Sequence, residues 1–270
     1  MRRRMIEVPG GAVAGIEFGP RSDPLAVLFL HANGFNACTY RHALAPLGDR
    51  VRVLAIDLRG HGLTTLPAAS PTPGWQIFAN DLCALIASLG EVPAVIAGHS
   101  MGGTTALLAA PHLPATHLVL FDPVISPRAD YAAAPPDYNS AFAVGAARRK
   151  SIFPDRATAF ASYRSRAAFA AWPDEVLHDY LKDGLRPAPD GTLCLSCTPA
   201  WETRNFAEYC QSDPYAGLTA DVRILRAETH STCALPESAN VQIIQGTTHF
   251  LPMERPDVIR AGILKEAVLF

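Results

Sequence analysis

A single serine between glycines is the residue of this chain best suited to nucleophilic chemistry. Ser100 stands in the run Gly-His-Ser-Met-Gly at 98–102, after an apolar stretch at 94–97 and before an Ala- and Leu-rich stretch at 101–110. The first stretch predicts a strand and the second a helix, so Ser100 lies in a sharp strand-to-helix turn. Such a turn holds the hydroxyl above the sheet and directs the N–H of Met101 at the same point, where negative charge would be stabilised. A glycine-rich turn with an incidental serine is the alternative.

A serine hydroxyl is a weak nucleophile at neutral pH and needs a general base. His249 is the best candidate among the nine histidines, because it follows the last predicted strand and precedes the closing helix. That position returns its side chain to the carboxyl edge of the sheet; a structural histidine near a helix start is the alternative. We expect His99, as part of the turn, to point away from the serine. We expect His61, in the glycine-rich run DLRGHG, to be structural.

Short apolar runs rich in β-branched residues alternate with helical runs along most of the chain. This alternation is typical of βαβ units with a mostly parallel sheet. Helices are predicted at 75–89, 101–110 and 256–270. The fold class is therefore α/β, with a doubly wound sheet of about eight strands. Those strands are predicted at 26–31, 51–57, 94–97, 117–122, 222–227 and 241–245, preceded by an antiparallel hairpin of 5–7 and 12–18.

The alternation stops between about 126 and 212, in a stretch rich in Pro, Ala, Arg and aromatic residues. A segment of this length is not a simple loop inside a compact domain. We interpret it as a mainly helical cap, inserted after the strand at 117–122 and lying over the carboxyl edge of the sheet. The core domain then comprises 1–125 and 213–270, and the cap comprises 126–212.

Two features of the cap have open interpretations. Its basic run, Arg148, Arg149 and Lys150, either meets an anionic substrate or ends a helix in solvent, as charge runs usually do. Its aromatic residues either line an apolar chamber above Ser100 or form the core of the cap itself. They are Tyr131, Tyr138, Phe142, Phe153, Phe160, Tyr163, Phe169, Trp172 and Trp201.

Four motifs together resemble the α/β-hydrolase superfamily, in its serine-hydrolase branch. They are LHANGF at 30–35, DLRGHG at 57–62, GHSMGG at 98–103 and GTTHFLPMERP at 246–256, and they span nearly the whole chain. The nucleophile is Ser rather than Asp, which argues against haloalkane dehalogenase and hydrolytic epoxide chemistry. The resemblance implies acyl transfer to Ser100 followed by hydrolysis, with no metal and no organic cofactor.

The carboxylate that should orient the base departs from the common pattern of this superfamily. Most relatives carry it just after the seventh strand, where the matching run here is RAETH at 226–230 and the expected Asp is His230. A histidine cannot serve as the anionic partner. Asp122, at the end of the sixth strand, is our preferred acid because it keeps the chain order Ser, Asp, His. Glu228 is one alternative, and Asp122 would then only turn the backbone at the strand end. An acid displaced elsewhere in the chain, or a weak dyad of Ser100 and His249 alone, is the other.

An oxyanion hole needs a second N–H besides that of Met101. By the same resemblance the donor is the backbone N–H of Asn33, in the loop His31–Phe35, although Gly34 or the side-chain amide of Asn33 could also serve. The alternative is a loop that merely connects strand and helix.

The composition bounds the remaining classes of protein. The chain has 270 residues, of which 49% are hydrophobic and 18% charged, with a net charge of −2. We expect a soluble, cytoplasmic protein without a secretory signal, a membrane span or a nucleic-acid surface. The six cysteines, including the lone pair Cys194 and Cys197, are expected to be free and buried thiols.

The sequence leaves two functions open. The first is a hydrolase acting on a carboxylic ester of a small to medium apolar substrate, with lactones, thioesters and carbon–carbon bonds as variants. The second is a ligand-binding protein on the same fold, favoured only by the missing acid at 230. A small-molecule acyl substrate is the expected partner, and a homodimer stays open.

Overall fold

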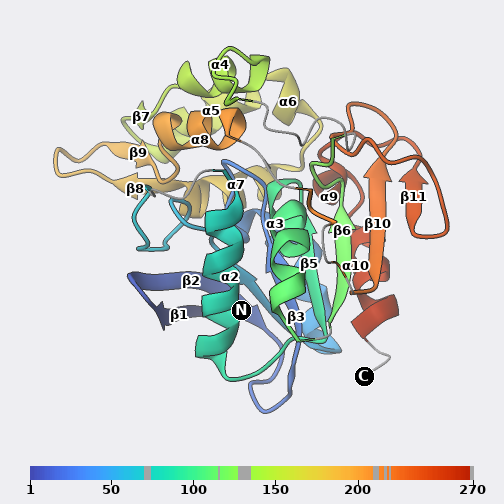
Figure 1. Cartoon of the computed structure of the whole chain (residues 1–270). Coiled ribbons are helices and arrows are strands. Elements are labelled where there is room, and N and C mark those ends of the chain that lie inside the picture. Colours follow the sequence, from blue (N-terminus) through green and yellow to red (C-terminus); the bar gives the residue numbers. More distant parts are fainter. Residues whose placement is uncertain are drawn as a thin grey trace.

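The computed structural model describes residues 1–69, 74–114, 116–126, 135–208, 213–215, 218 and 220–267. Its centre is an eight-stranded sheet in the order β1-β2-β4-β3-β5-β6-β10-β11 (Figure 1). The strands are β1 (Arg2–Val8), β2 (Gly11–Phe18), β3 (Leu25–Leu30), β4 (Arg52–Ile56), β5 (Val95–His99), β6 (His117–Phe121), β10 (Val222–Ala227) and β11 (Val241–Ile244). The predicted α/β class and eight-stranded, mostly parallel sheet are confirmed.

Only the N-terminal edge of the sheet is antiparallel. β1 pairs with β2 across a tight turn at Gly10 and Gly11, both at positive φ, and β2 pairs antiparallel with β4. From β4 to β11 all neighbours are parallel. The central strands β3, β5 and β6 are almost completely buried, as expected for parallel strands covered on both faces. Their carboxyl ends therefore meet at one edge.

Helices cover both faces of the sheet. α2 (Gln76–Leu89) and α3 (Met101–Ala109) pack on one face, and α1 (Arg41–Leu44) and α10 (Pro256–Ala267) pack on the other. Each face has its own hydrophobic core, which explains why β-strand side chains alternate between two apolar clusters. Short elements complete these layers: the 3-10 turns Ala37–Tyr40, Ala45–Asp49 and Ala110–His112, and α9 (Leu251–Glu254).

The elements between β6 and β10 lie together beyond the carboxyl ends of the parallel strands (Figure 1). The helices there are α4 (Ala141–Ala147), α5 (Arg156–Arg164), α6 (Ala167–Ala170), α7 (Asp174–Gly184) and α8 (Pro199–Ala207). A second, antiparallel sheet joins them, in the order β7 (Ile152–Phe153), β9 (Leu193–Leu195) and β8 (Leu185–Pro187). The sequence did not predict this small sheet, because strands of two or three residues leave no periodic pattern.

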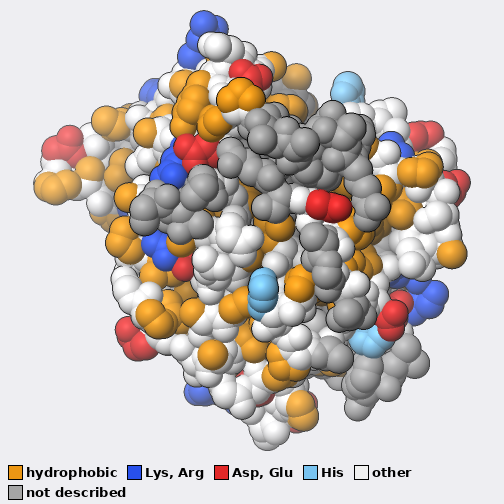
Figure 2. All heavy atoms as spheres, viewed as in Figure 1, with side chains coloured by type: hydrophobic (Ala, Val, Ile, Leu, Met, Phe, Trp, Pro, Cys, Tyr) orange, Lys and Arg blue, Asp and Glu red, His pale blue; other side chains and the backbone are white. Residues whose placement is uncertain are grey.

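Other predictions concern membrane-spanning helices, the state of the cysteines and the charge of the surface. No helix among the described residues is long and apolar enough to cross a membrane. The described cysteines are free thiols; Cys38, Cys197 and Cys233 are buried, whereas Cys83 and Cys194 are partly exposed, and Cys210 lies outside the described residues. Lys and Arg side chains are scattered among acidic and apolar ones over the described part of the face in Figure 2, in keeping with the net charge of −2.

Candidate active site

Ser100 occupies a strained turn between β5 and α3. Its backbone has φ 54° and ψ −122°, a conformation that a non-glycine residue adopts only when its surroundings impose it. The surroundings are tight: a Cβ at Gly98 would lie 2.6 Å from the carbonyl of Gly102, and one at Gly102 would lie 2.5 Å from the oxygen of Leu30. Only glycines therefore let α3 approach the sheet so closely. The turn holds the Ser100 hydroxyl at the carboxyl edge, as predicted.

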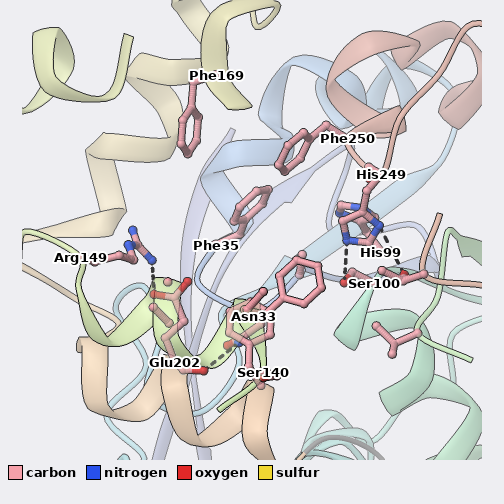
Figure 3. A pocket seen from close by; sticks show the side chains of 18 of the residues that line it. Asn33, Phe35, His99, Ser100, Ser140, Arg149, Phe169, Glu202, His249 and Phe250 are labelled. Carbon is pink, nitrogen blue, oxygen red and sulfur yellow. Dashed lines mark hydrogen bonds and ion pairs between the residues drawn. The ribbon is translucent and has the colours of Figure 1, made fainter. Parts of the chain in front are cut away.

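His249 connects the serine to a carboxylate. It lies between β11 and α9, and its Nε2 is 3.0 Å from Ser100 Oγ. Its Nδ1 lies 2.6 Å from Oδ2 of Asp122, directly after β6. Because an ionised carboxylate only accepts, Nδ1 carries the proton and donates it, which leaves the Nε2 lone pair for the serine hydroxyl. The three side chains that the sequence singled out are thus brought together (Figure 3 shows Ser100 and His249).

Asp122 is completely buried and held by donors from the end of β10 and the loop after it. Its Oδ1 accepts from the N–H of Ala227 (2.9 Å) and the hydroxyl of Ser231 (2.5 Å), and its Oδ2 accepts from the N–H of Thr232 (3.0 Å). Burial opposes ionisation, but the bond from His249 and these donors outweigh it and lower the pKa of Asp122 to about 2. The carboxylate is therefore an anion at neutral pH.

The alternative acid lies elsewhere. Glu228 is exposed and accepts from the N–H of Gly246 at 2.8 Å. His230, at the position where the superfamily pattern predicts an acid, is exposed and adopts φ 53°. The carboxylate beside His249 is thus that of Asp122, directly after β6, and the end of β10 and the loop after it supply donors to this carboxylate.

The prediction that His99 points away from the serine is wrong. Its ring lies beside that of His249, with centroids 4.9 Å apart, and lines the same cavity (Figure 3). His99 Nε2 is 2.7 Å from the carbonyl oxygen of His249 and therefore donates to it. Its Nδ1 then accepts from the hydroxyl of Tyr40, also at 2.7 Å. Burial and the neighbouring His249 lower the pKa of His99 to about 3, so this ring is neutral.

The hydroxyl of Tyr40 links His99 to the loop after β3. The N–H of Ala32 donates to its hydroxyl at 3.1 Å, so one chain of hydrogen bonds links that loop, Tyr40, His99 and the backbone of His249. Sequence reasoning missed Tyr40, because nothing in its local run distinguishes it from a core aromatic residue. Only the fold brings it beside His99, 59 positions further along.

Some of the candidate N–H donors for the oxyanion hole already donate to an acceptor within the protein. The N–H of Gly34 donates to Nε2 of His61 at 3.0 Å, and that of Ala32 donates to Tyr40. The N–H of Gly34 is therefore already engaged, and the side-chain amide of Asn33 uses one of its two hydrogens on the carbonyl of Glu202 at 3.1 Å. The backbone N–H of Asn33 has no acceptor among the described residues. Met101 is the first residue of α3, so its N–H has no carbonyl partner within the helix.

The ring of His61 bonds the backbone of the loop at 31–35, which fits the structural role predicted for this histidine. Nε2 accepts from Gly34, so Nδ1 carries the proton and donates to the carbonyl of Arg59 at 2.8 Å. Burial lowers the pKa of His61 to about 4 and keeps the ring neutral. The conformation of the loop at 31–35 is thus fixed by rings that carry no charge.

A cavity of about 490 Å³ opens above Ser100 and His249. It lies between the main sheet and the helices that follow β6, and most of its wall is apolar (Figure 3). Of the aromatic residues predicted in the cap, Phe142, Tyr163 and Phe169 line it, whereas Phe153, Trp172 and Trp201 are buried in packing. Both interpretations of those aromatics therefore hold for different residues; Tyr131 lies outside the described residues.

The three residues of the basic run at 148–150 differ in exposure. Arg148 and Lys150 are exposed, as expected for a helix end in solvent. Arg149 is not: only 12% of its side chain is accessible, it lines the cavity, and it forms an ion pair with Glu202. The sequence gave no sign of Glu202, since it lies 53 residues along the chain on α8.

Comparison with known proteins decides the family. The model of the alpha/beta hydrolase family matches residues 27–261. The chain belongs to this family. It is 24% identical over 260 residues to 2-(acetamidomethylene)succinate hydrolase of Mesorhizobium japonicum, a match that covers 90% of this chain and 87% of that protein.

Solved structures of this alpha/beta hydrolase's relatives share its fold over nearly their whole length. The crystal structure of E-2-(acetamidomethylene)succinate hydrolase matches with a TM-score of 0.77 at 21% identity, covering 98% of both chains. A thioesterase domain from the curacin biosynthetic pathway matches with a TM-score of 0.76 at 19% identity, covering 98% of this chain and 99% of that one. The first of these proteins is a hydrolase of an acetamidomethylene-substituted succinate, and the second is a thioesterase domain.

Proposed function

We propose that this chain is a serine hydrolase that cleaves a carboxylic ester or a related acyl bond through an acyl-enzyme. One observation carries the proposal: a continuous chain of hydrogen bonds runs from Ser100 Oγ through His249 to Asp122 in the wall of an apolar cavity. A nucleophile, a base and an orienting anion in this geometry are the parts that acyl transfer needs.

In the proposed cycle, Ser100 Oγ attacks the substrate carbonyl carbon while its proton passes to Nε2 of His249. The buried anion of Asp122 stabilises the resulting imidazolium. The N–H groups of Met101 and Asn33 receive the negative oxygen of the tetrahedral intermediate. The imidazolium then protonates the leaving group, which departs. Water attacks the acyl-enzyme with His249 again as base, which releases the acid and restores Ser100.

Two features support a small to medium acyl group. The cavity volume of about 490 Å³ lies in the usual range for small-molecule sites. Phe35, Val124, Phe169 and Phe250 are among the apolar residues that line it, and they would contact a hydrocarbon chain. The alternative of a binding protein depended on the missing acid at 230. The carboxylate of Asp122 beside His249 supports the hydrolase instead.

Turnover of p-nitrophenyl acetate and butyrate tests the proposal. Ser100→Ala should abolish turnover, whereas Ser140→Ala is the matched control. Ser140 lines the same cavity, but its hydroxyl accepts from the N–H of Ala143 at the start of α4. Equal rates for wild type and Ser100→Ala would overturn the proposal. Thioesters and lactones of the same acyl chain, compared by kcat/KM, assign the bond.

A further inference from the structure

The wall of the cavity opposite Ser100 is polar, in contrast to the rest of the lining. Arg149, Arg166 and Glu202 line the cavity together with the phenols of Tyr163 and Tyr180. Figure 3 shows Arg149 and Glu202 across the cavity from Ser100 and His249, with Phe35 in between. The proposed acyl-transfer chemistry uses none of these five side chains, so their presence needs another explanation.

Arg149 is already neutralised. It pairs with Glu202 through Nη1, and its Nη2 donates to the hydroxyls of Tyr163 (2.6 Å) and Tyr180 (2.7 Å). Only 12% of the Arg149 side chain and 8% of the Glu202 side chain are accessible. Burial opposes the charge of Arg149, but Tyr180, Glu202 and Tyr163 together raise its pKa well above its ordinary value. The pair is therefore permanent and adds no net charge to the cavity.

The two phenols are oriented by this arginine. Because Arg149 occupies a lone pair on each phenol oxygen, the O–H hydrogens of Tyr163 and Tyr180 must point away from it. The phenols also contact each other, which uses one of these hydrogens at most. Burial raises the pKa of Tyr180 well above its ordinary value, so its hydroxyl keeps its proton. Tyr163 has no exposed surface and Tyr180 is 2% exposed, so the two phenols hold Arg149 behind the cavity wall rather than contact a ligand.

Arg166 supplies the net charge. Its guanidinium lies over the ring of Tyr163, with 4.8 Å from Cζ to the ring centroid, and the side chain is half-buried at the cavity wall. No carboxylate among the described residues pairs with it. With the Arg149–Glu202 pair neutral, this end of the cavity carries one uncompensated positive charge, the guanidinium of Arg166 with its own N–H donors.

We propose that this end of the cavity is a subsite for a single carboxylate, so that the preferred substrates are acyl compounds that carry one carboxylate away from the bond to be cleaved. The subsite consists of the guanidinium of Arg166, which lies over the ring of Tyr163, and Arg149 holds that ring in place through its hydroxyl. Glu202 limits the net charge to one, which disfavours dianions. The part of this inference that concerns ester cleavage rests on the proposed function; the binding of a carboxylate does not.

The first test compares two esters of equal shape that differ in charge. Mono-p-nitrophenyl adipate carries a terminal carboxylate, and p-nitrophenyl 6-methylheptanoate has an isopropyl group in its place. Wild type should prefer the adipate by about 10- to 100-fold in kcat/KM, the usual worth of a charged hydrogen bond. Arg166→Gln should lose that preference, because kcat/KM for the adipate falls to the level of kcat/KM for the neutral ester measured with the same variant. Arg148→Gln, which removes an exposed charge next to the cavity residue Arg149, should keep the preference.

The second test needs no turnover. Monomethyl adipate should bind to the Ser100→Ala protein in a calorimeter, and Ser100→Ala combined with Arg166→Gln should bind it at least 10-fold more weakly. Equal binding by the two proteins would overturn the subsite even if esters are cleaved. Equal kcat/KM for the two esters in wild type would overturn it as well. If no ester is cleaved but the binding difference is found, the reaction is wrong and the subsite stands.

Discussion

Replacing Asp122 by Asn should damage catalysis far more than the loss of one hydrogen bond suggests. Four residues donate to the carboxylate: Ala227 and Ser231 to Oδ1, and Thr232 and His249 to Oδ2. An amide has only one accepting oxygen. In either orientation, its NH₂ group faces a backbone N–H that cannot move away, either that of Ala227 or that of Thr232.

The orientation that keeps the bond to Ala227 has the larger consequence for the base. It places the amide NH₂ at the former Oδ2, opposite Nδ1 of His249. The imidazole must then accept at Nδ1 and carry its proton on Nε2, which prevents it from taking a proton from Ser100. A wrong tautomer of this kind costs about 10⁴ in kcat in the well-studied serine proteases. We expect a loss of about 10³–10⁴, or about 4–5.5 kcal/mol of transition-state stabilisation.

The assay is steady-state hydrolysis of p-nitrophenyl butyrate, with kcat and KM determined separately. KM should change little, because Asp122 does not touch the cavity, and urea unfolding checks that the variant is folded. Glu228→Gln is the matched control and should retain wild-type kcat, since the Glu228 carboxylate accepts from the N–H of Gly246, in the loop before His249, and bonds no other group in the described part of the chain. A folded Asp122→Asn protein with more than a tenth of wild-type kcat would refute the reasoning, and so would a large loss in Glu228→Gln.

Three further predictions follow from the supporting residues. Tyr40→Phe should lower kcat about 10-fold with KM nearly unchanged, because it loosens the base and the oxyanion loop without touching substrate; a change in KM alone would contradict this. Gly102→Ala should lower the unfolding free energy by about 1–3 kcal/mol, because its Cβ would meet a backbone oxygen of β3, whereas Gly145→Ala, with open space around it, should not destabilise. Burial keeps three histidines neutral in the fold while the unfolded chain protonates them below pH about 6.5: His31, His61 and His99. Asp57, whose pKa burial raises to about 6, offsets one of these protons, so urea unfolding should show stability falling by up to about 3 kcal/mol per pH unit between pH 6 and 4. His112→Gln, at an exposed position, should leave that slope unchanged, and a pH-independent stability would contradict the burial argument.

Much of the fold could be predicted because its signals are local. Strand β5, the turn at Ser100 and the helix after it are visible in one run of residues, and the structure places their ends within two residues of the prediction. Asp122 was also within reach, since a carboxylate at the end of a strand lies at the carboxyl edge wherever the strand pairs. Its role as the acid remains a proposal.

What could not be predicted depends on partners far away in sequence. The orientation of His99 is fixed by Tyr40 and by the carbonyl of His249, which come from opposite ends of the chain. The burial of Arg149 is fixed by Glu202, so a basic run that reads as a solvated helix end contains one residue of the cavity wall. No periodicity in the sequence records such pairings.

The most direct test of the account is to find which residue becomes covalently modified. The protein is treated with a p-nitrophenyl alkylphosphonate, and the adduct is located by mass spectrometry of proteolytic peptides. The account predicts one phosphonyl group per chain, on Ser100, with labelling slowed at least 100-fold in His249→Ala because the base is gone. An adduct on another residue, or hydrolysis of p-nitrophenyl butyrate that continues after Ser100 is fully labelled, would contradict it.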